Sequence, residues 1–429
     1  MAGFDMALGI DQDTLNRAIK AMYPSAHNRI FMGSYSIEIH GIKAAIKWDI
    51  SKAPMLDLNP SVRAEAVIPE ILAKLQTHKN ISKSNIKLAA SSMTNATFSM
   101  IFPSIVLTLS LPVAQQSATF SANVLCQARI NPNGQIELAA VHLDLDTLTN
   151  KLEFLDLIIN SLSAPLIHVA NNVLKGIRIP SVTVEGITLS TPAAAVSGGR
   201  LIILVNLASK GSPAPVRGPW PNGAVFSLAS KELINEAVRN SYYMGKIPHE
   251  ISYSGSQDMG ITTAYYRATI QVGLPDVGMD GADFVITLRL GGNVDAGFTT
   301  FLGRLGLNYK AVIQPNPIAC KVVLSVNSSQ QLMANIPSMP RATVLLQPQG
   351  NVGEEVLSTL NVVQANIVSL ILSSLIPQII RSISVPVATI PSIPVDFGDV
   401  HVKIRASNLH VGNFSGMALI AGNLEVTNA

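Results

Sequence analysis

The chain has few charged and few aromatic residues for its size. Charged residues make up 13% and aromatic residues 5% of its 429 residues, whereas hydrophobic residues make up 48%. The net charge is +3 and no block of lysine or arginine occurs, so the electrostatic footprint of a nucleic-acid-binding protein is missing. A mean hydropathy of +0.35 predicts that much apolar surface is buried, or that the protein encloses an apolar cavity.

Cysteines and the motifs of known enzymes are also scarce. The two cysteines, Cys126 and Cys320, lie too far apart in the sequence to form a disulfide framework, so we expect two unpaired, partly buried thiols. The sequence contains no G-x-S-x-G elbow, no phosphate-binding loop, no G-x-G-x-x-G after a strand and no C-x-x-C pair. We therefore expect a protein that is not an enzyme and that carries no cofactor.

Two patterns resemble parts of metal sites. His142, Asp144 and Asp146 project from one side of an expected strand end. This row fits a cation site, but the solvated face of an amphipathic strand is the interpretation that we favour. His249 begins an H-E-x-x-H motif, but Tyr253 stands where the second histidine would be. We therefore predict no metal site.

No segment predicts export or membrane insertion. The opening MAGFDMALGIDQDTL lacks a basic segment followed by an apolar run, so we expect no signal peptide, and the location stays open between the cytoplasm and release by a non-classical route. Residues 356–380 carry no charge and are long enough to cross a bilayer. Their polar side chains gather within roughly 100° on a helical wheel, which predicts a soluble helix with one solvated edge.

Residues 146–180 predict one long amphipathic helix. Leucine, isoleucine and valine recur at steps of three, four or seven, which places them on one stripe at about 3.6 residues per turn. Asp146 is the expected N-cap, and Pro165 should kink the helix because it removes one backbone donor. The stripe consists of Leu148, Leu152, Leu155, Ile159, Leu162, Leu166 and Val173.

The same plan occurs twice, which indicates an internal duplication. Residues 354–392 again combine a long apolar-faced helix, a proline inside it at Pro377 and an extended exit. The helix proline is followed by a Pro-Ser pair after 15 residues in the first copy and after 14 in the second. A short helix also recurs, because LNRAIKAMY (15–23) matches INEAVRNSY (234–242) at an offset of 219, and Pro24 should end the first of these helices.

Between the short and long helices the hydrophobic period changes to two. Alternating or continuous apolar segments at 34–50, 97–111, 117–130 and 134–146 predict an antiparallel meander. The alternation changes phase at Ala139–Ala140, which predicts a bulge and a strongly curved sheet. The last strands of the first copy are expected at 180–190 and 200–208, and those of the second copy at 261–274, 283–292, 304–314, 320–327, 342–350, 400–411 and 417–427.

These elements predict an α+β fold of two tandem modules. Residues 206–223 are rich in proline and glycine, which is typical of a linker. We therefore expect modules at 1–205 and 224–429, each a highly curved antiparallel sheet wrapped around one long kinked amphipathic helix.

This plan resembles the tubular lipid-binding superfamily, which includes the bactericidal/permeability-increasing, lipopolysaccharide-binding and plasma lipid transfer proteins. The resemblance covers essentially the whole chain and rests on architecture, because the superfamily has no catalytic signature. The chain lacks the signal peptide, the intramodule cysteine pair and the basic tip of the secreted animal members. In these respects, and in its opening GFDMALGIDQDTLNRAI, it is more similar to bacterial members such as those encoded in clostridial neurotoxin clusters.

The resemblance implies a tunnel for acyl chains between each long helix and its sheet. The same apolar stripes also fit an ordinary core without free space, and this alternative stays open. Each buried CH₂ group would contribute about 0.8 kcal/mol to binding, so no polar contact is needed. The expected lipid-binding residues are Leu152, Leu155, Ile159, Leu162 and Leu166 in the first helix and Val363, Ile367, Leu370 and Ile371 in the second.

We therefore expect a protein that binds, sequesters or transfers a lipid or another apolar ligand. Its partners would be that ligand and, transiently, a membrane surface, but not nucleic acid. The alternative is a non-enzymatic interaction or assembly protein that uses the same fold as a scaffold for a protein partner, for example as an accessory of a toxin or secretion system.

Overall fold

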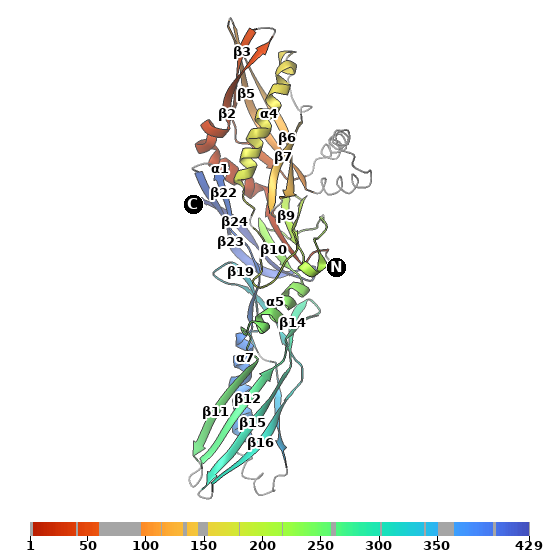
Figure 1. Ribbon diagram of the computed structural model, residues 1–429, viewed down its shortest axis with the longest axis vertical. Coiled ribbons are helices and arrows are strands. Elements are labelled where there is room, and N and C mark those ends of the chain that lie inside the picture. The colour runs from red at the N-terminus through yellow and green to blue at the C-terminus, as the bar shows by residue number, and fades with distance from the viewer. Residues whose placement is uncertain are drawn as a thin grey trace.

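The computed structural model is an elongated α+β molecule with a curled antiparallel sheet toward each end and a further sheet between them (Figure 1). Among the described residues helices are few, and one of them, α4 (Glu153–Gly176), is long. We refer to residues 1–205 as the first unit and to residues 224–429 as the second unit. The structure describes residues 3–39, 42–59, 96–112, 114–131, 135–144, 153–179, 181–216, 218–258, 263–300, 303–338, 340–350, 364–397 and 400–428.

The central sheet joins both units. β1 and β10 pair antiparallel at its centre, with Leu8 opposite Ser227. These two residues lie 219 positions apart, which is the offset of the sequence repeat, so a pseudo-twofold axis passes between them. The strand order is β22 (Ile393–Phe397), β23 (Val400–Phe414), β24 (Met417–Asn428), β10 (Val225–Ala229), β1 (Met6–Asp11), β9 (Arg200–Val205) and β8 (Ala193–Ser197).

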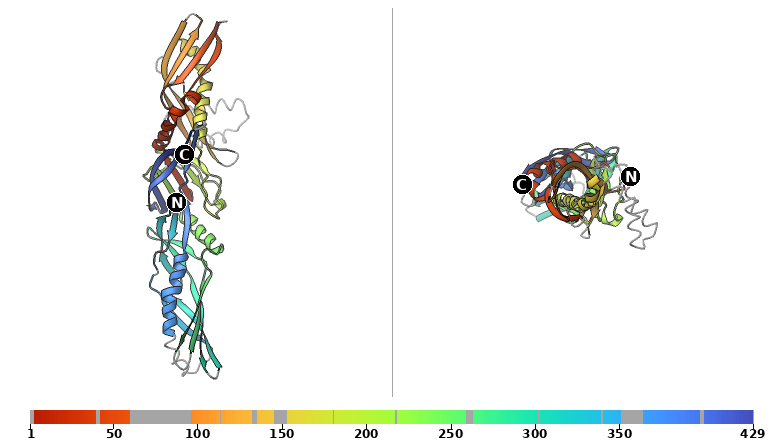
Figure 2. Two further views of the ribbon diagram at one scale, coloured as in Figure 1. Left: turned by 90° about the vertical axis from the view of Figure 1, so that its left-hand side faces the viewer. Right: turned by 90° about the horizontal axis from the view of Figure 1, so that it is seen from above.

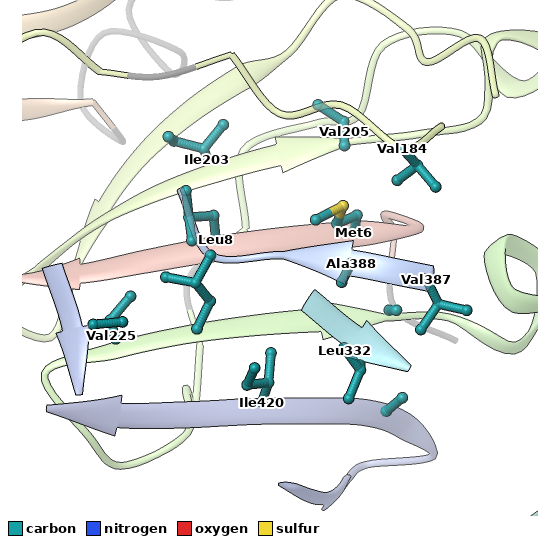
Figure 3. Packing of buried hydrophobic residues seen from close by; sticks show 14 of the residues in the cluster. Met6, Leu8, Val184, Ile203, Val205, Val225, Leu332, Val387, Ala388 and Ile420 are labelled. Atoms are coloured by element: carbon teal, nitrogen blue, oxygen red, sulfur yellow. The ribbon is translucent and has the colours of Figure 1, made fainter. Parts of the chain in front are cut away.

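One face of the central sheet belongs to the main core of the molecule. Met6 and Leu8 of β1 are buried in it, as expected for alternate residues of a strand. Figure 3 shows these side chains in one packed cluster with Leu332 and Val387, which come from the second unit. The apolar core is therefore continuous from one unit into the other.

The opposite face of the central sheet carries a smaller core that the predicted linker covers. Ala7 lies there with Phe226, whose ring packs so closely on Gly9 that an added Cβ would meet it at 2.2 Å. Trp220 stacks on Phe226 with the ring centroids 5.8 Å apart. Residues 206–223 thus include a side chain that packs on the sheet, and the module boundaries on either side of this segment stay a prediction.

The first unit has a six-stranded curled sheet, and its strands confirm the predicted meander. Figure 2 shows the sheet as an arc around α4 when the molecule is viewed along its long axis. α4 contacts β7, and the first unit also contains α1 (Gln12–Ile30). The short helix η2 (Ala208–Lys210) lies just after the first unit. The order is β2 (Met32–Ile39), β3 (Ile42–Ile50), β5 (Thr97–Leu111), β6 (Ala114–Ile130) and β7 (Ile136–Asp144), with β4 (Met55–Asp57) paired to β5.

The predicted bulge in β7 is confirmed and also fixes α4. Leu125 pairs with His142, whereas the residue after Leu125 pairs with Ala140, so Val141 is the extra residue. The Ala140 N–H donates to Oδ1 of Asn171 on α4 at 2.9 Å. The irregularity that bends the strand therefore supplies a hydrogen bond that holds the helix against the sheet.

The second unit repeats this plan with more and shorter strands. Its curled sheet has the order β11 (Glu250–Asp258), β12 (Thr263–Val272), β15 (Leu290–Thr300), β16 (Gly303–Gln314) and β20 (Thr343–Gln349). One small sheet consists of β13 (Asp276–Asp280), β14 (Asp283–Leu288) and β17 (Ile318–Lys321). A second small sheet consists of β18 (Val323–Val326), β19 (Gln331–Asn335) and β21 (Ser384–Thr389). The helices are α5 (Lys231–Tyr243), helical residues 364–370, the π-helical turn η3 (Ile371–Leu375) and α7 (Ile376–Ser382).

The two long-helix prolines are accommodated differently. α4 continues through Pro165 as an α-helix. In the second unit η3 comes directly before Pro377, where its wider turn leaves room for the proline ring. The described helix at Gln364–Ser382 is long and apolar enough to cross a membrane, a property that core helices of soluble proteins share, and 33% of its apolar window is buried. The expected N-cap Asp146 lies outside the described residues.

The expected end of the first short helix was wrong. α1 begins after the N-cap Asp11, whose Oδ1 accepts from the Thr14 N–H at 3.0 Å. It then continues beyond Pro24 to Ile30. Pro24 is exposed while Met22 and Ala26 remain buried, so packing of the apolar stripe outweighs the hydrogen bond that the proline removes.

The strand expected at residues 180–190 was also wrong. Its described part, 181–190, makes only isolated bridges such as Val184 with Ile187, because Gly186 turns the chain there with a φ of +70°. The strand that precedes β9 is instead β8, which was not predicted.

Aligned residues of the two short helices make equivalent bonds, which supports the duplication. The Tyr23 hydroxyl donates to the Ile50 carbonyl oxygen at 2.6 Å. The aligned Tyr242 donates to the Val272 carbonyl oxygen at 2.8 Å. Each tyrosine thus ties its helix, α1 or α5, to the end of the second strand of the curled sheet of its unit.

Candidate functional site

Part of the predicted site lies on α4. Leu166 is buried in the main core with 1% of its surface exposed. Leu155, Ile159 and Leu162 belong to α4, but their side chains lie outside the described part of the structure, as does the whole of Leu152. Protein atoms alone cover Leu166, so a ligand could reach it only if the helix and the sheet moved apart.

The second helix gives a similar picture. Ile367 and Ile371 are 0% exposed and belong to the main core, whereas Leu370 is half-buried. Val363 lies outside the described residues. η3 contacts both edge strands of the curled sheet, β11 and β20, so the helix lies across the opening of that sheet. That these residues bind lipid stays a prediction.

The C-terminal half of α4 is fixed against the central sheet. Its inward face continues from Leu166 through Val169 and Val173, each at most 1% exposed. Just beyond the helix, Ile177 forms a bridge with Val395 of β22, and Arg178 pairs with Asp396 at 3.1 Å. The end of α4 is therefore held by a strand from the second unit.

A cavity of about 420 Å³, which we call the basal cavity, lies where the first unit meets the central sheet. It is enclosed by the start of β7, by residues that follow α4 up to Pro192, and by β9. Ile203 and Val205 of β9 line it and also belong to the main core. Its remaining aliphatic walls come from Ile136, Ile179, Val182, Ile187 and Leu189.

None of the described residues that line the basal cavity carries a charged side chain. Its polar groups are uncharged, and they include Ser181, Thr183, Thr188 and Gln135. A buried ion without a partner is strongly disfavoured, whereas aliphatic walls with a few hydroxyl groups suit an apolar chain with a neutral polar end. The cavity can therefore hold and orient a neutral amphiphile, but it offers no group for catalysis.

Backbone hydrogen bonds hold the irregular wall of the cavity in place. The Ser190 N–H donates to the Asn206 carbonyl oxygen at 2.8 Å, and the Asn206 N–H donates to Ser190 Oγ at 3.1 Å. The Ala208 N–H donates to the Thr188 carbonyl oxygen at 3.0 Å. The cavity is thus formed before any ligand arrives.

The titratable groups of the described residues provide no reactive centre. Cys126 and Cys320 are unpaired and buried, as predicted. Burial raises the pKa of the Cys320 thiol to about 11 and that of Cys126 further, so both stay protonated near neutral pH. Within the described ranges, no three histidine, cysteine, aspartate or glutamate side chains gather as metal ligands, and Asp146 of the considered row falls outside those ranges.

Sequence analysis missed the basal cavity because it assigned residues 180–190 to a strand. In a regular strand the apolar side chains of Val182, Ile187 and Leu189 would have packed on the sheet. A signal was present at Gly186 and Pro192, which punctuate this segment and favour a loop. A loop with apolar side chains against a sheet is the arrangement that leaves space between them.

The fold is similar to those of two solved proteins over nearly the full length of the chain. The lipopolysaccharide binding protein matches with a TM-score of 0.33 and 11% identity, covering 98% of this chain and 99% of that protein. P47 from Clostridium botulinum A2 matches with a TM-score of 0.47 and 11% identity, covering 98% and 97%. The expected likeness is thus found at the level of the fold, and it does not extend to ligands or partners.

Other comparisons give no relative. No family model matches the sequence, and no curated protein matches it. Neither of the two similar solved proteins is named as an enzyme.

Proposed function

We propose that the protein binds a neutral lipid or another apolar ligand, with the apolar chain in the basal cavity. The observation that carries this proposal is an aliphatic, uncharged cavity of about 420 Å³. Ligand sites in proteins typically measure roughly 300 to 1,000 Å³ and combine apolar walls with a few polar groups. Because Ile203 and Val205 belong both to the cavity wall and to the main core, a bound chain would extend that core.

Binding would be driven by burial of the ligand's apolar surface. Each CH₂ group transferred from water contributes about 0.8 kcal/mol, and part of this gain is offset by the lost freedom of the ligand. The hydroxyl groups of Thr183 and Thr188 would hydrogen-bond a neutral head group near the wall.

A matched pair of variants tests the proposal. Val182 is half-buried and lines the basal cavity, whereas Val323 is 43% exposed and lies in the second unit. Val182→Trp should fill the cavity and weaken binding of the neutral dye N-phenyl-1-naphthylamine by about tenfold or more, since a few lost CH₂ equivalents are enough. Val323→Trp adds the same side chain elsewhere and should leave the affinity unchanged.

Native mass spectrometry of the purified protein complements the dye titration. It is performed before and after incubation with dioleoyl phosphatidylcholine, palmitic acid and cholesterol. One stoichiometric lipid, absent from Val182→Trp, is the expected result. If the unmodified protein takes up neither dye nor lipid, or if both variants bind equally, the basal cavity is not a ligand site.

A second candidate function is that of an interaction or assembly scaffold. The observation in its favour is the complete burial of Ile367 and Ile371 and the near-complete burial of Leu166 by protein atoms alone, since a filled interior does not need a ligand. Size-exclusion chromatography with light scattering and crosslinking in a native extract separates the two functions. A stable protein complex together with a lipid-free mass would favour the scaffold.

A further inference from the structure

A second cavity, which we call the α1 groove, lies outside the core between α1 and the chain around β4. Its volume is about 820 Å³. α1 and β22 are labelled side by side in Figure 1 and contact each other. Three cationic side chains, Arg17, Lys20 and Lys52, and one carboxylate, Asp13, border an apolar surface that includes Tyr23, Pro54 and Met55.

The walls of the α1 groove are held rigidly. Asn16 Oδ1 accepts from the Leu56 N–H at 2.6 Å, and its Nδ2 donates to the Leu56 carbonyl oxygen at 2.9 Å. One turn earlier, Gln12 Oε1 accepts from the Leu58 N–H at 3.0 Å. The hydroxyl of Tyr23 is fixed by its bond to Ile50. A preformed groove binds a ligand without paying for its own ordering.

Within the described part of the chain the three cations of the α1 groove make no ion pair, and the Asp13 carboxylate that also lines the groove leaves its net charge positive. Arg17 Nη2 donates to the Thr14 hydroxyl at 2.9 Å and to the Leu424 carbonyl oxygen at 3.2 Å, which fixes the guanidinium without neutralising it. Across the described residues neither Lys20 nor Lys52 makes an ion pair. All three side chains are exposed, so their charges are available to a ligand.

The duplication provides an internal comparison. Asn235 on α5 aligns with Asn16, and its Oδ1 accepts from the Val277 N–H at 2.8 Å as Asn16 accepts from Leu56. Leu56 therefore aligns with Val277, and the residues that precede them align as well. In this alignment Asp276 stands where the first unit has Met55.

At these aligned positions the second unit has no free cationic cluster. Arg239, which aligns with Lys20, pairs with Asp276 at 2.9 Å. Glu236 stands in place of Arg17, and Gly273 stands in place of Lys52. The three unpaired cations and the exposed methionine are thus specific to the first unit, and the fold does not require them.

We propose that the α1 groove binds a single amphiphile with an anionic head group, a carboxylate or a phosphate. The head group would lie among Arg17, Lys20 and Lys52, and the apolar chain would lie on Tyr23 and Met55. Arginine and lysine are the usual partners of carboxylate and phosphate oxygens. A concave groove matches one molecule rather than a flat bilayer, and the uncharged basal cavity offers no such head-group site.

Dodecyl phosphate, below its critical micelle concentration, is the probe for this site, with titration calorimetry as the measurement. We expect saturable binding by the full chain, weakened about tenfold by Lys20→Gln with Lys52→Gln, because exposed ion pairs contribute modestly one by one. Binding should also weaken as salt is raised, since exposed charges are screened. Arg239→Gln in the second unit is the matched control and should leave the affinity unchanged.

The other arms identify the source of the signal. Inorganic phosphate should not bind measurably, because it lacks the chain, and dodecanol should bind at least about tenfold more weakly than dodecyl phosphate. Equal binding of dodecanol, or an unchanged affinity in the double lysine variant, would overturn the proposal. Tighter binding of an acidic peptide of alternating glutamate and leucine would assign the groove to a protein partner instead.

The two sites can be separated experimentally. Val182→Trp in the basal cavity should not alter dodecyl phosphate binding, and the double lysine variant should not alter dye binding. If the unmodified protein binds dodecyl phosphate but not the dye, the proposed function is wrong and the α1 groove remains a ligand site. If it binds the dye but not dodecyl phosphate, only the proposal for the α1 groove is wrong.

Discussion

The two units build the same kind of curled sheet and fill it differently. In the first unit the buried strand residues are large, and Phe98, Phe102 and Phe120 are each at most 5% exposed. In the second unit the strands of the curled sheet bury Ala268, Ala296 and Ala311, each at most 1% exposed, beside the larger Tyr309 at 1%. Protein interiors are packed to nearly constant density, so the space beside these alanines is filled from elsewhere. The isoleucine-rich helix at 364–382 supplies side chains to the same core, namely Ile367, Ile371, Ile376, Ile379 and Ile380.

The units differ equally on their surfaces. The short helix of the second unit balances Arg239 with Asp276, whereas that of the first unit leaves Lys20 unpaired beside an apolar groove. After duplication the hydrogen bonds of Asn16 and Asn235 were kept, and the charges around them were not. The asparagine hydrogen bonds, which both units share, therefore belong to the fold, whereas the cationic side chains around Asn16 are a feature of the first unit.

The largest expected effect tests the filling of the second unit. Ile371→Ala should lower the free energy of unfolding by about 3 kcal/mol, because it leaves a cavity in a fully buried core. Leu370→Ala, at a half-buried neighbouring position, should cost clearly less. Urea unfolding followed by circular dichroism measures both. A loss below about 1 kcal/mol at Ile371, together with lipid uptake, would instead indicate an open tunnel beside this residue.

A slightly smaller effect is expected where the two units join. The Asp5 side chain is 2% exposed, and its oxygens accept from Lys210 Nζ at 2.6 Å, Ser230 Oγ at 3.0 Å and the Leu207 N–H at 3.0 Å. Asp5→Ala should cost about 2 kcal/mol, since donors in a buried position lose their acceptor.

The location of Asp5 makes the form of this transition informative. Its partners lie in the segment between the units and at the N-cap of α5, so both units should lose stability in one cooperative transition. Asp276→Ala, which removes an exposed ion pair, should cost less than about 0.5 kcal/mol. Two separate unfolding transitions of Asp5→Ala would contradict a core that is continuous across the units.

Periodicity predicted much of the fold. The strands from 97–111 and 117–130 agree with β5 and β6, because alternate side chains along them face opposite sides of one sheet. The bulge near Ala139 was visible for the same reason. β1 and β10 were missed because they are short and buried on both faces, so MALGID and VFSLA show no alternation of polar and apolar residues.

The candidate site could be predicted less well. The apolar stripes that contain Leu166 on the first long helix and Ile367 on the second were recognised as buried faces. Hydrophobic periodicity does not distinguish a packed core from the wall of a tunnel. The basal cavity and the α1 groove are made by segments far apart in the sequence, such as α1 with Lys52. No local pattern records a space between such segments, so the cavities became visible only in the fold.

A third comparison uses the two aligned asparagines. Asn16 makes two hydrogen bonds to the Leu56 backbone, whereas Asn235 makes one to Val277. At about 1 kcal/mol for each bond, Asn16→Ala should cost about 2 kcal/mol and Asn235→Ala about half of that. Thermal unfolding of the two variants side by side is the measurement. Asn16→Asp keeps the acceptor and loses the donor, so it should fall between the parent and Asn16→Ala.

The smallest effect concerns the two buried thiols, one in each unit. Burial raises the pKa of Cys320 from 9.0 to about 11 and that of Cys126 further. Around pH 9 to 11 the folded chain therefore holds protons that the unfolded chain releases, so the free energy of unfolding falls as the pH rises through this range. At pH 9, where about half of the unfolded thiols are ionised, the loss is below about half a kcal/mol for each thiol.

The two thiols can be resolved by combining pH with single substitutions. Cys126→Ser and Cys320→Ser should each remove one share of this alkaline sensitivity, measured by urea unfolding at pH 7 and pH 9. In the folded protein neither thiol should react with Ellman's reagent at pH 8, because burial keeps both protonated and covered. As the pH is raised, Cys320 should react before Cys126, since its pKa is raised less. Labelling of Cys126 before Cys320 would instead show that the first unit opens more readily than the second.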